Sequence, residues 1–200
     1  MSAPAARLAP APVLADLIRV DSRQTARVRD AILTLAGTAF ITIAGYIIIP
    51  LPFTPVPISL ATFAVLLTGA ALGPLRGGMS AGIYLALGLV GVPLFANGQF
   101  GWAFASFGYT IGYIAATLLV GILARRRSDR NVWTTLGLAT LGSLAIYVFG
   151  VPWLAAFLGI DLATALMLGV VPFLIGDAIK VVAMSALLPT TWRIVDRTRS

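Results

Sequence analysis

The sequence of 200 residues contains no cysteine, no histidine and no glutamate. Without cysteine, disulfide frameworks and thiol chemistry are excluded, and metal sites built from histidine or cysteine are excluded with them. The P-loop pattern G-x-x-x-x-G-K-[ST] is absent as well, so the chain is not itself an ATPase. These absences argue against a metalloprotease or a thiol enzyme and favour a protein that binds or transports rather than one that catalyses.

Charge is also scarce, because only 10% of the residues are charged while 59% are hydrophobic. An ordinary soluble domain carries about 25% charged residues, and so short a chain cannot bury this much apolar surface by itself. We therefore expect an integral membrane protein. On such a protein a net charge of +7 indicates membrane orientation rather than nucleic-acid binding.

Six apolar segments are candidate membrane spans, since a spanning helix needs about 20 mostly apolar residues. They cover residues 31–49, 58–72, 79–95, 102–124, 132–151 and a span within 162–188. Four prolines in residues 50–57 predict an ordered, non-helical linker, and residues 75–78 predict a short corner. Pro172 permits a tilted or broken start to the last span. The prediction is an all-α membrane protein with six helices in one compact bundle.

The arginines separate cleanly between the two sides that this topology creates. Every arginine lies before residue 30, in the corner 75–78, in residues 125–130 or after residue 190, and the connections 50–57, 96–101 and 152–161 contain none. With six spans, the four basic stretches fall on one side, which the positive-inside rule makes cytoplasmic. We expect a cytoplasmic N-terminal tail over 1–29, a transmembrane domain over 30–190 and a basic cytoplasmic tail over 191–200. Residues 1–29 lack the continuous apolar run of a secretory signal.

Asp177 and Lys180, the only lysine, stand inside the last apolar segment. A charge at the centre of a membrane helix costs about 2.5–3.5 kcal/mol on insertion scales, and a spacing of three places both side chains on one helical face. Either the pair pins this helix to the bundle, or it forms a polar pocket for a ligand. Arginine is available elsewhere and suits a static bidentate bridge better, so the choice of lysine favours a pocket, which the topology would open outward.

Other candidate ligand contacts lie on the same expected outer side. The connection 94–102 holds Asn97, glycines and three aromatic residues, and is either an interfacial loop or a lid over the pocket. Tyrosines also lie within the spans, where a buried hydroxyl needs a hydrogen-bond partner. They are Tyr84, Tyr109, Tyr113 and Tyr147. Most of these would bond a neighbouring helix, and Tyr84 and Tyr113 are the candidates to face a ligand.

Three motifs carry a resemblance to a known family. Residues 49–78 read IPLPFTPVPISLATFAVLLTGAALGPLRGG, residues 84–95 read YLALGLVGVPLF, and residues 172–180 read PFLIGDAIK. They resemble the BioY family, the biotin-specific substrate-binding (S) components of energy-coupling factor (ECF) transporters, over residues 31–190. Three stretches depart from the family pattern: Ala61 stands where glutamine is usual, residues 107–113 replace G-P-T-G-G-Y, and Thr34, Thr38 and Thr42 replace the usual Ala-x-x-x-Ala stripe.

The resemblance implies a multi-pass protein of the bacterial plasma membrane with an outward-facing biotin pocket, in which Asp177 and Lys180 contribute to ligand binding. It implies no bound cofactor, since ATP would be used only by partner subunits. Those partners would be a transmembrane coupling (T) subunit and two ABC-type ATPases, unless the protein works alone or as a homo-oligomer. The alternatives are an S component for another vitamin, or a structural or assembly membrane protein whose Asp–Lys pair only fastens a helix.

Overall fold

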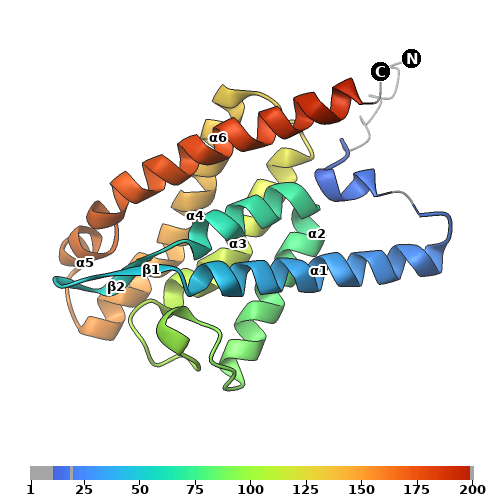
Figure 1. Ribbon diagram of the computed structural model, residues 1–200. Coiled ribbons are helices and arrows are strands. Elements are labelled where there is room, and N and C mark those ends of the chain that lie inside the picture. The colour runs from blue at the N-terminus through green and yellow to red at the C-terminus, as the bar shows by residue number, and fades with distance from the viewer. Residues whose placement is uncertain (1–10, 19, 199–200) are drawn as a thin grey trace, which may run out of the picture.

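The computed structural model describes residues 11–18 and 20–198, and most of them are helical (Figure 1). The helices are α1 (Arg23–Gly45), α2 (Ala61–Leu89), α3 (Phe107–Ala124), α4 (Val132–Leu158), α5 (Leu162–Gly169) and α6 (Leu174–Arg197). Short 3-10 turns are η1 (Leu14–Leu17), η2 (Ala96–Gly98) and η3 (Val171–Phe173), and two strands are β1 (Ile48–Leu51) and β2 (Thr54–Ser59). Of these, α1, α3, α4 and the segment Leu162–Arg197 are long and apolar enough to cross a membrane.

The proline-rich segment after α1 forms a β-hairpin, a strand pairing that the all-α prediction did not include. β1 and β2 pair in antiparallel fashion with Ile48 opposite Ser59 and Ile49 opposite Ile58. Proline lacks the N–H that a helix interior requires, but it is tolerated in edge strands, and both strands of a two-stranded sheet are edges. The linker is ordered and non-helical, as predicted, and its hydrogen bonds give it a defined register.

The two segments 58–72 and 79–95 contribute the arms of one kinked helix, α2, instead of forming two helices joined by a loop. Gly73 has φ +82° at the kink, a conformation that glycine adopts without steric penalty, and Pro74 begins the second arm, where its missing N–H costs nothing. A methyl group on Gly77 would lie 3.1 Å from Gly69 Cα, so the arms approach closely beside the kink. The expected corner 75–78 is therefore helical.

Several other helix ends differ from the predicted ones. α1 begins at Arg23, before the first apolar segment, and α6 continues to Arg197, beyond the last one. α3 begins at Phe107, later than predicted, and α4 runs through Pro152 to Leu158. The last segment is broken into α5, η3 and α6 beside Pro172, as the sequence allowed.

Glycines let the central helices α2, α3 and α4 pack with their backbones in close contact. A methyl group on Gly69 would lie 2.8 Å from the Thr117 carbonyl oxygen of α3, and one on Gly112 would lie 2.8 Å from Ile146 Cα of α4. Small residues allow this approach between membrane helices. Large apolar side chains instead project outward from α1, α4 and α6, among them Ile43, Val148 and Ile175, which suits contact with lipid.

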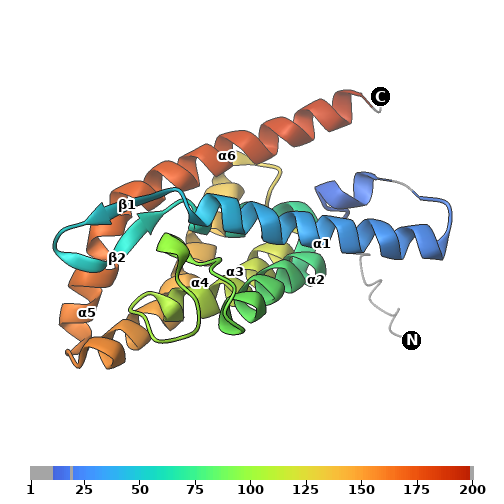
Figure 2. The ribbon, with the colours of Figure 1, turned by 60° about the horizontal axis from the view of Figure 1, so that its bottom comes forward.

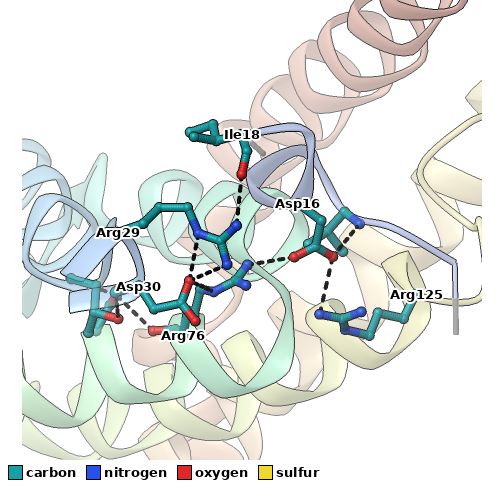
Figure 3. A network of polar contacts seen from close by, with 9 residues as sticks. Asp16, Ile18, Arg29, Asp30, Arg76 and Arg125 are labelled. Carbon is teal, nitrogen blue, oxygen red and sulfur yellow. Dashed lines mark hydrogen bonds and ion pairs between the residues drawn. The ribbon is translucent and has the colours of Figure 1, made fainter. Parts of the chain in front are cut away.

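The first described segment, residues 11–18, lies at the end of the molecule opposite the hairpin (Figures 1 and 2), where charged side chains form a network. Figure 3 shows Asp16 between Arg76 of α2 and Arg125 at the end of α3. The Asp16 carboxylate lies 2.8 Å from Arg76 Nη1 and 3.3 Å from Arg125 Nη2. Arg76 Nε also lies 3.0 Å from Asp30 of α1. Burial acts to raise the pKa of Asp16, but the hydrogen bond from Arg76 and the charge of Arg125 outweigh it, so this pKa lies below its ordinary value. The segment 11–18 is thus fastened to the helical body.

Candidate functional site

A cavity of about 690 Å³, including its mouth, lies toward the hairpin end of the molecule. Its walls come from β2, both arms of α2, the loop after α2, the first half of α3, the middle of α4 and the start of α6. Segments far apart in the sequence therefore converge on one pocket.

Four polar side chains meet at one part of the cavity wall. Lys180 Nζ lies 3.2 Å from Asp177 Oδ1 and donates a 2.7 Å hydrogen bond to Thr62 Oγ1 of α2. The Tyr147 hydroxyl of α4 donates to the other carboxylate oxygen, Asp177 Oδ2. The Lys180 and Asp177 side chains are only 12% and 14% exposed. The two charges therefore neutralise each other in a largely buried place, with one neutral hydroxyl bound to each.

The break before α6 places this pair at the cavity. Pro172 lies in η3, and α6 starts at Leu174, so Asp177 falls in its first turn. The free backbone N–H groups and the dipole of a helix N-terminus favour a carboxylate there. Lys180 follows one turn later on the same face, which brings its Nζ back to Asp177. The local sequence P-F-L-I-G-D-A-I-K thus supplies both the break and the pair.

Aromatic rings line another part of the cavity. The Tyr84 ring lies 5.2 Å from Phe95 and 6.1 Å from Tyr113, and Phe95 lies 5.4 Å from Phe104, centroid to centroid. All four rings are buried and line the cavity. Such ring pairs are rigid and apolar, so this wall suits a flat or cyclic apolar group.

Four of the five residues predicted from the sequence come together here, namely Asp177, Lys180, Tyr84 and Tyr113. Asn97 is exposed in η2 with φ +60°, and it is not among the residues that line the cavity. Its neighbours Phe95 and Ala96 do line the cavity, so the loop reaches the pocket through the residues before Asn97. A ligand contact from Asn97, like a ligand role for the other four, stays a prediction.

Sequence reasoning named Tyr147 only among the span tyrosines that need a partner, and it did not single out the other hydroxyl groups of the site. Thr62 and Tyr147 contact the charged pair, and Ser59, Ser106 and Ser143 line the cavity. Single hydroxyl residues in apolar segments carry no pattern that separates a site residue from a helix contact. Tyr109 is a helix contact of this kind, because its hydroxyl donates a 2.8 Å hydrogen bond to the Gly169 carbonyl and joins α3 to α5.

The polar group has hydrogen-bonding capacity left for a ligand. An ammonium group has three N–H donors, and two of those on Lys180 are directed at Asp177 and Thr62. A carboxylate has about four acceptor positions, and Asp177 uses two, for Lys180 and Tyr147. A donor and an acceptor side by side suit a neutral group that carries both N–H and C=O. Among the described residues, no cluster of three or more acidic side chains that could hold a metal ion is found.

Comparisons with known proteins agree with one another. The sequence profile of the BioY family matches residues 19–197. The "Probable biotin transporter BioY" of Pyrococcus horikoshii is 39% identical over 129 residues, covering 63% of this chain and 74% of the relative. The "Biotin transporter BioY" of Rhizobium etli is 33% identical over 170 residues, covering 80% and 90%.

A solved structure has the same fold. The crystal structure of "the S-component for biotin from an ECF-type ABC transporter" superposes with a TM-score of 0.76 at 27% sequence identity, and the match covers 87% of this chain and 95% of that one. The similarity therefore extends over nearly the whole membrane domain rather than over one motif.

Proposed function

The chain belongs to the BioY family, and from this we propose that it takes up biotin, binding it in the cavity beside Asp177 and Lys180. It is a membrane transport component rather than an enzyme. Because a solved neighbour is the S-component of an ECF-type ABC transporter, we propose the same assignment here. A coupling (T) subunit and two ATPases would then supply the energy, with action alone or as a homo-oligomer as the alternative.

The observation that best supports this proposal is that a hydrogen-bond donor (Lys180), an acceptor (Asp177) and an aromatic wall line the same cavity. The ureido ring of biotin has two N–H donors and a carbonyl, its thiophane ring is apolar, and its tail ends in a carboxylate. Asp177 would accept a ureido N–H while Lys180 donates to the ureido carbonyl. The tail would lie away from Asp177, since like charges repel in a site of low dielectric constant.

The helix arrangement and the position of the basic residues support the proposed topology of six crossings with both termini in the cytoplasm. The arms of α2 count as two crossings, and α5 and α6 count as one broken crossing. Arg76, Arg125 and the end of α6 then lie on the basic, cytoplasmic side, while the cavity lies toward the hairpin and would open outward. In bacteria the membrane would be the plasma membrane.

Calorimetry on purified, detergent-solubilised protein tests the substrate. We expect saturable biotin binding at one site by the wild type and loss of that binding in the Asp177→Ala/Lys180→Ala variant. A well-folded wild type that binds no biotin would refute the proposal. Binding of a different vitamin in a ligand panel would favour an S component for that vitamin, and wild-type affinity in the double variant would refute the assignment of the site.

A structural role makes the opposite prediction. If the pair only fastened α6 to the bundle, no small molecule would bind, and replacing the pair with apolar residues would leave function intact. Buried ion pairs can often be replaced in this way without loss of stability.

Biotin uptake by cells that carry the chain with and without a coupling module separates the ECF assignment from action alone.

A further inference from the structure

We propose that Tyr147 and Thr62 are positioning residues, which hold the carboxylate of Asp177 and the ammonium of Lys180 in the orientation that the ligand requires. This inference rests on the proposed function, because it concerns the same cavity. It adds two residues from two further helices and a division of roles, in which the charged pair contacts the ligand while the two hydroxyls orient the pair.

Tyr147 fixes the orientation of the Asp177 carboxylate. Its hydroxyl donates to Oδ2 while Lys180 bonds Oδ1, so both carboxylate oxygens are held and the group cannot rotate freely. The ring of Tyr147 is itself restrained by an edge-to-face contact with Tyr109, at 6.2 Å and 85°. Tyr109 is in turn tied to the Gly169 carbonyl by its hydroxyl. The direction of the carboxylate is therefore set by the α3–α4–α5 framework.

Thr62 does the same for Lys180, whose flexible side chain would otherwise sample many rotamers. The Thr62 hydroxyl donates weakly to the Ser59 carbonyl, at 3.4 Å, and accepts from Lys180 Nζ at 2.7 Å. The contacts to Thr62 and Asp177 fix two of the three N–H directions and thereby determine the third. Lys180 is anchored by its own helix and by the first turn of α2, next to the hairpin.

Both anchors are neutral, and this decides which ligand group the site prefers. Tyr147 and Thr62 orient the pair without changing its zero net charge, so the polar part of the cavity offers a directed donor and acceptor but no excess charge. Recognition of a neutral ureido group depends on hydrogen-bond direction, which makes the affinity sensitive to the loss of an anchor. Ordering these side chains before the ligand arrives also lowers the entropy cost of binding.

Substitutions that delete one hydroxyl test the inference. We expect Tyr147→Phe and Thr62→Val each to weaken biotin binding about tenfold, the usual scale of one lost hydrogen bond, without abolishing it. Thr62→Ser restores the hydroxyl and should bind within about threefold of the wild type on the same reasoning. Wild-type affinity in both deletion variants, or Thr62→Ser as weak as Thr62→Val, would overturn the inference.

A double-mutant cycle of melting temperatures, measured without ligand, tests the positioning role directly. Because no biotin is present, the result does not depend on the proposed function. Tyr147→Phe should lower the melting temperature of the wild type but not that of the Asp177→Ala variant, because the partner is already gone. The control is Trp192→Phe, which removes an indole N–H bond to Asp129 at the opposite end of the molecule and should lower both melting temperatures equally. Equal effects of Tyr147→Phe in both backgrounds would overturn the inference whether or not biotin binds. Failure of the wild type to bind biotin would instead overturn the proposed function.

Discussion

The substitution Gly88→Ala tests whether the loop after α2 is held on the cavity by close packing. Gly88 faces the ring of Phe95, which is 1% exposed and lines the cavity. A carbon added at Gly88 would lie 2.5 Å from Phe95 Cε2 and still closer to Cζ and Cε1. Carbon atoms normally approach to about 3.5–4.0 Å, so the ring must move by about 1 Å or more.

The ring has little room for this movement. Phe95 packs against Tyr84 at 5.2 Å and Phe104 at 5.4 Å, and the Gly101 N–H bonds the Gly88 carbonyl at 2.8 Å. Overpacking a tight core costs about 1–3 kcal/mol. Alanine recovers up to about 1 kcal/mol through its higher helix propensity. The net loss is thus about 0–3 kcal/mol, and the aromatic wall shifts with it.

Gly82→Ala on the same arm of α2 is the matched control, because nothing lies within 4 Å of its added carbon. It should be neutral or stabilising by up to about 1 kcal/mol, so the two variants should differ by about 1–3 kcal/mol. For a chain of this size that corresponds to about 2–12 °C in melting temperature, measurable by tryptophan fluorescence in detergent. We also expect Gly88→Ala to weaken biotin binding about tenfold. Equal melting temperatures and equal affinities in the two variants would refute the packing argument.

Three further predictions concern the end of the molecule opposite the cavity. Asp16→Asn should lower the melting temperature at pH 7 by an amount worth about 1 kcal/mol. Because the pKa of Asp16 is lowered on folding from 3.8, the wild type should lose this advantage as the pH falls through and below 4; a gap that widens in acid would contradict the network. Trp192→Phe removes the 2.6 Å hydrogen bond to the buried Asp129 and should destabilise by about 1–3 kcal/mol, whereas an unchanged melting temperature would show that the bond contributes nothing. Gly121→Ala would place a carbon 2.6 Å from the Gly73 carbonyl carbon and should destabilise the protein by about 3 kcal/mol or more. Its control, Gly137→Ala, has nothing within 4 Å of the added carbon and should not destabilise. Similar yields and melting temperatures for both variants would contradict this prediction.

Much of the fold is encoded in local pattern, which explains why reading the sequence succeeded there. Uninterrupted apolar runs marked most of the helical segments, since apolar length and the absence of charge are properties of the chain itself. The break beside Pro172 was foreseeable because proline removes one backbone donor. The prolines of residues 50–57 excluded a helix but did not reveal a hairpin, because strand pairing depends on a partner strand. The kink at Gly73 was interpreted as a loop, because a Gly-Pro pair is compatible both with a loop between two helices and with a kink inside one.

Some residues of the candidate site could be predicted from the sequence and others could not. Asp177 and Lys180 stood out because charge inside an apolar segment is costly wherever the segment lies, and Tyr84 and Tyr113 stood out as polar groups that need partners. Asn97 was chosen from the composition of its loop, but the left-handed turn of η2 leaves it exposed. Tyr147 belonged to the same set of span tyrosines but was not chosen, because the sequence does not show which of them face a ligand. Thr62 resembles many other hydroxyl residues in apolar helices, and no sequence pattern marks it.

The sequence by itself determined that this protein belongs in a membrane, that no thiol, histidine or P-loop chemistry is available to it, and that one pair of opposite charges lies inside an apolar segment. These conclusions follow from composition and local spacing, which no later folding step can change. Only the tertiary structure decided that the pair lies beside an aromatic wall, that Tyr147 and Thr62 hold its two members, and that Asn97 lies off the cavity. The last of these facts follows from the turn of η2. The first two depend on the crossing of α2, α4 and α6, which joins residues more than 100 positions apart through contacts such as that between Thr62 and Lys180.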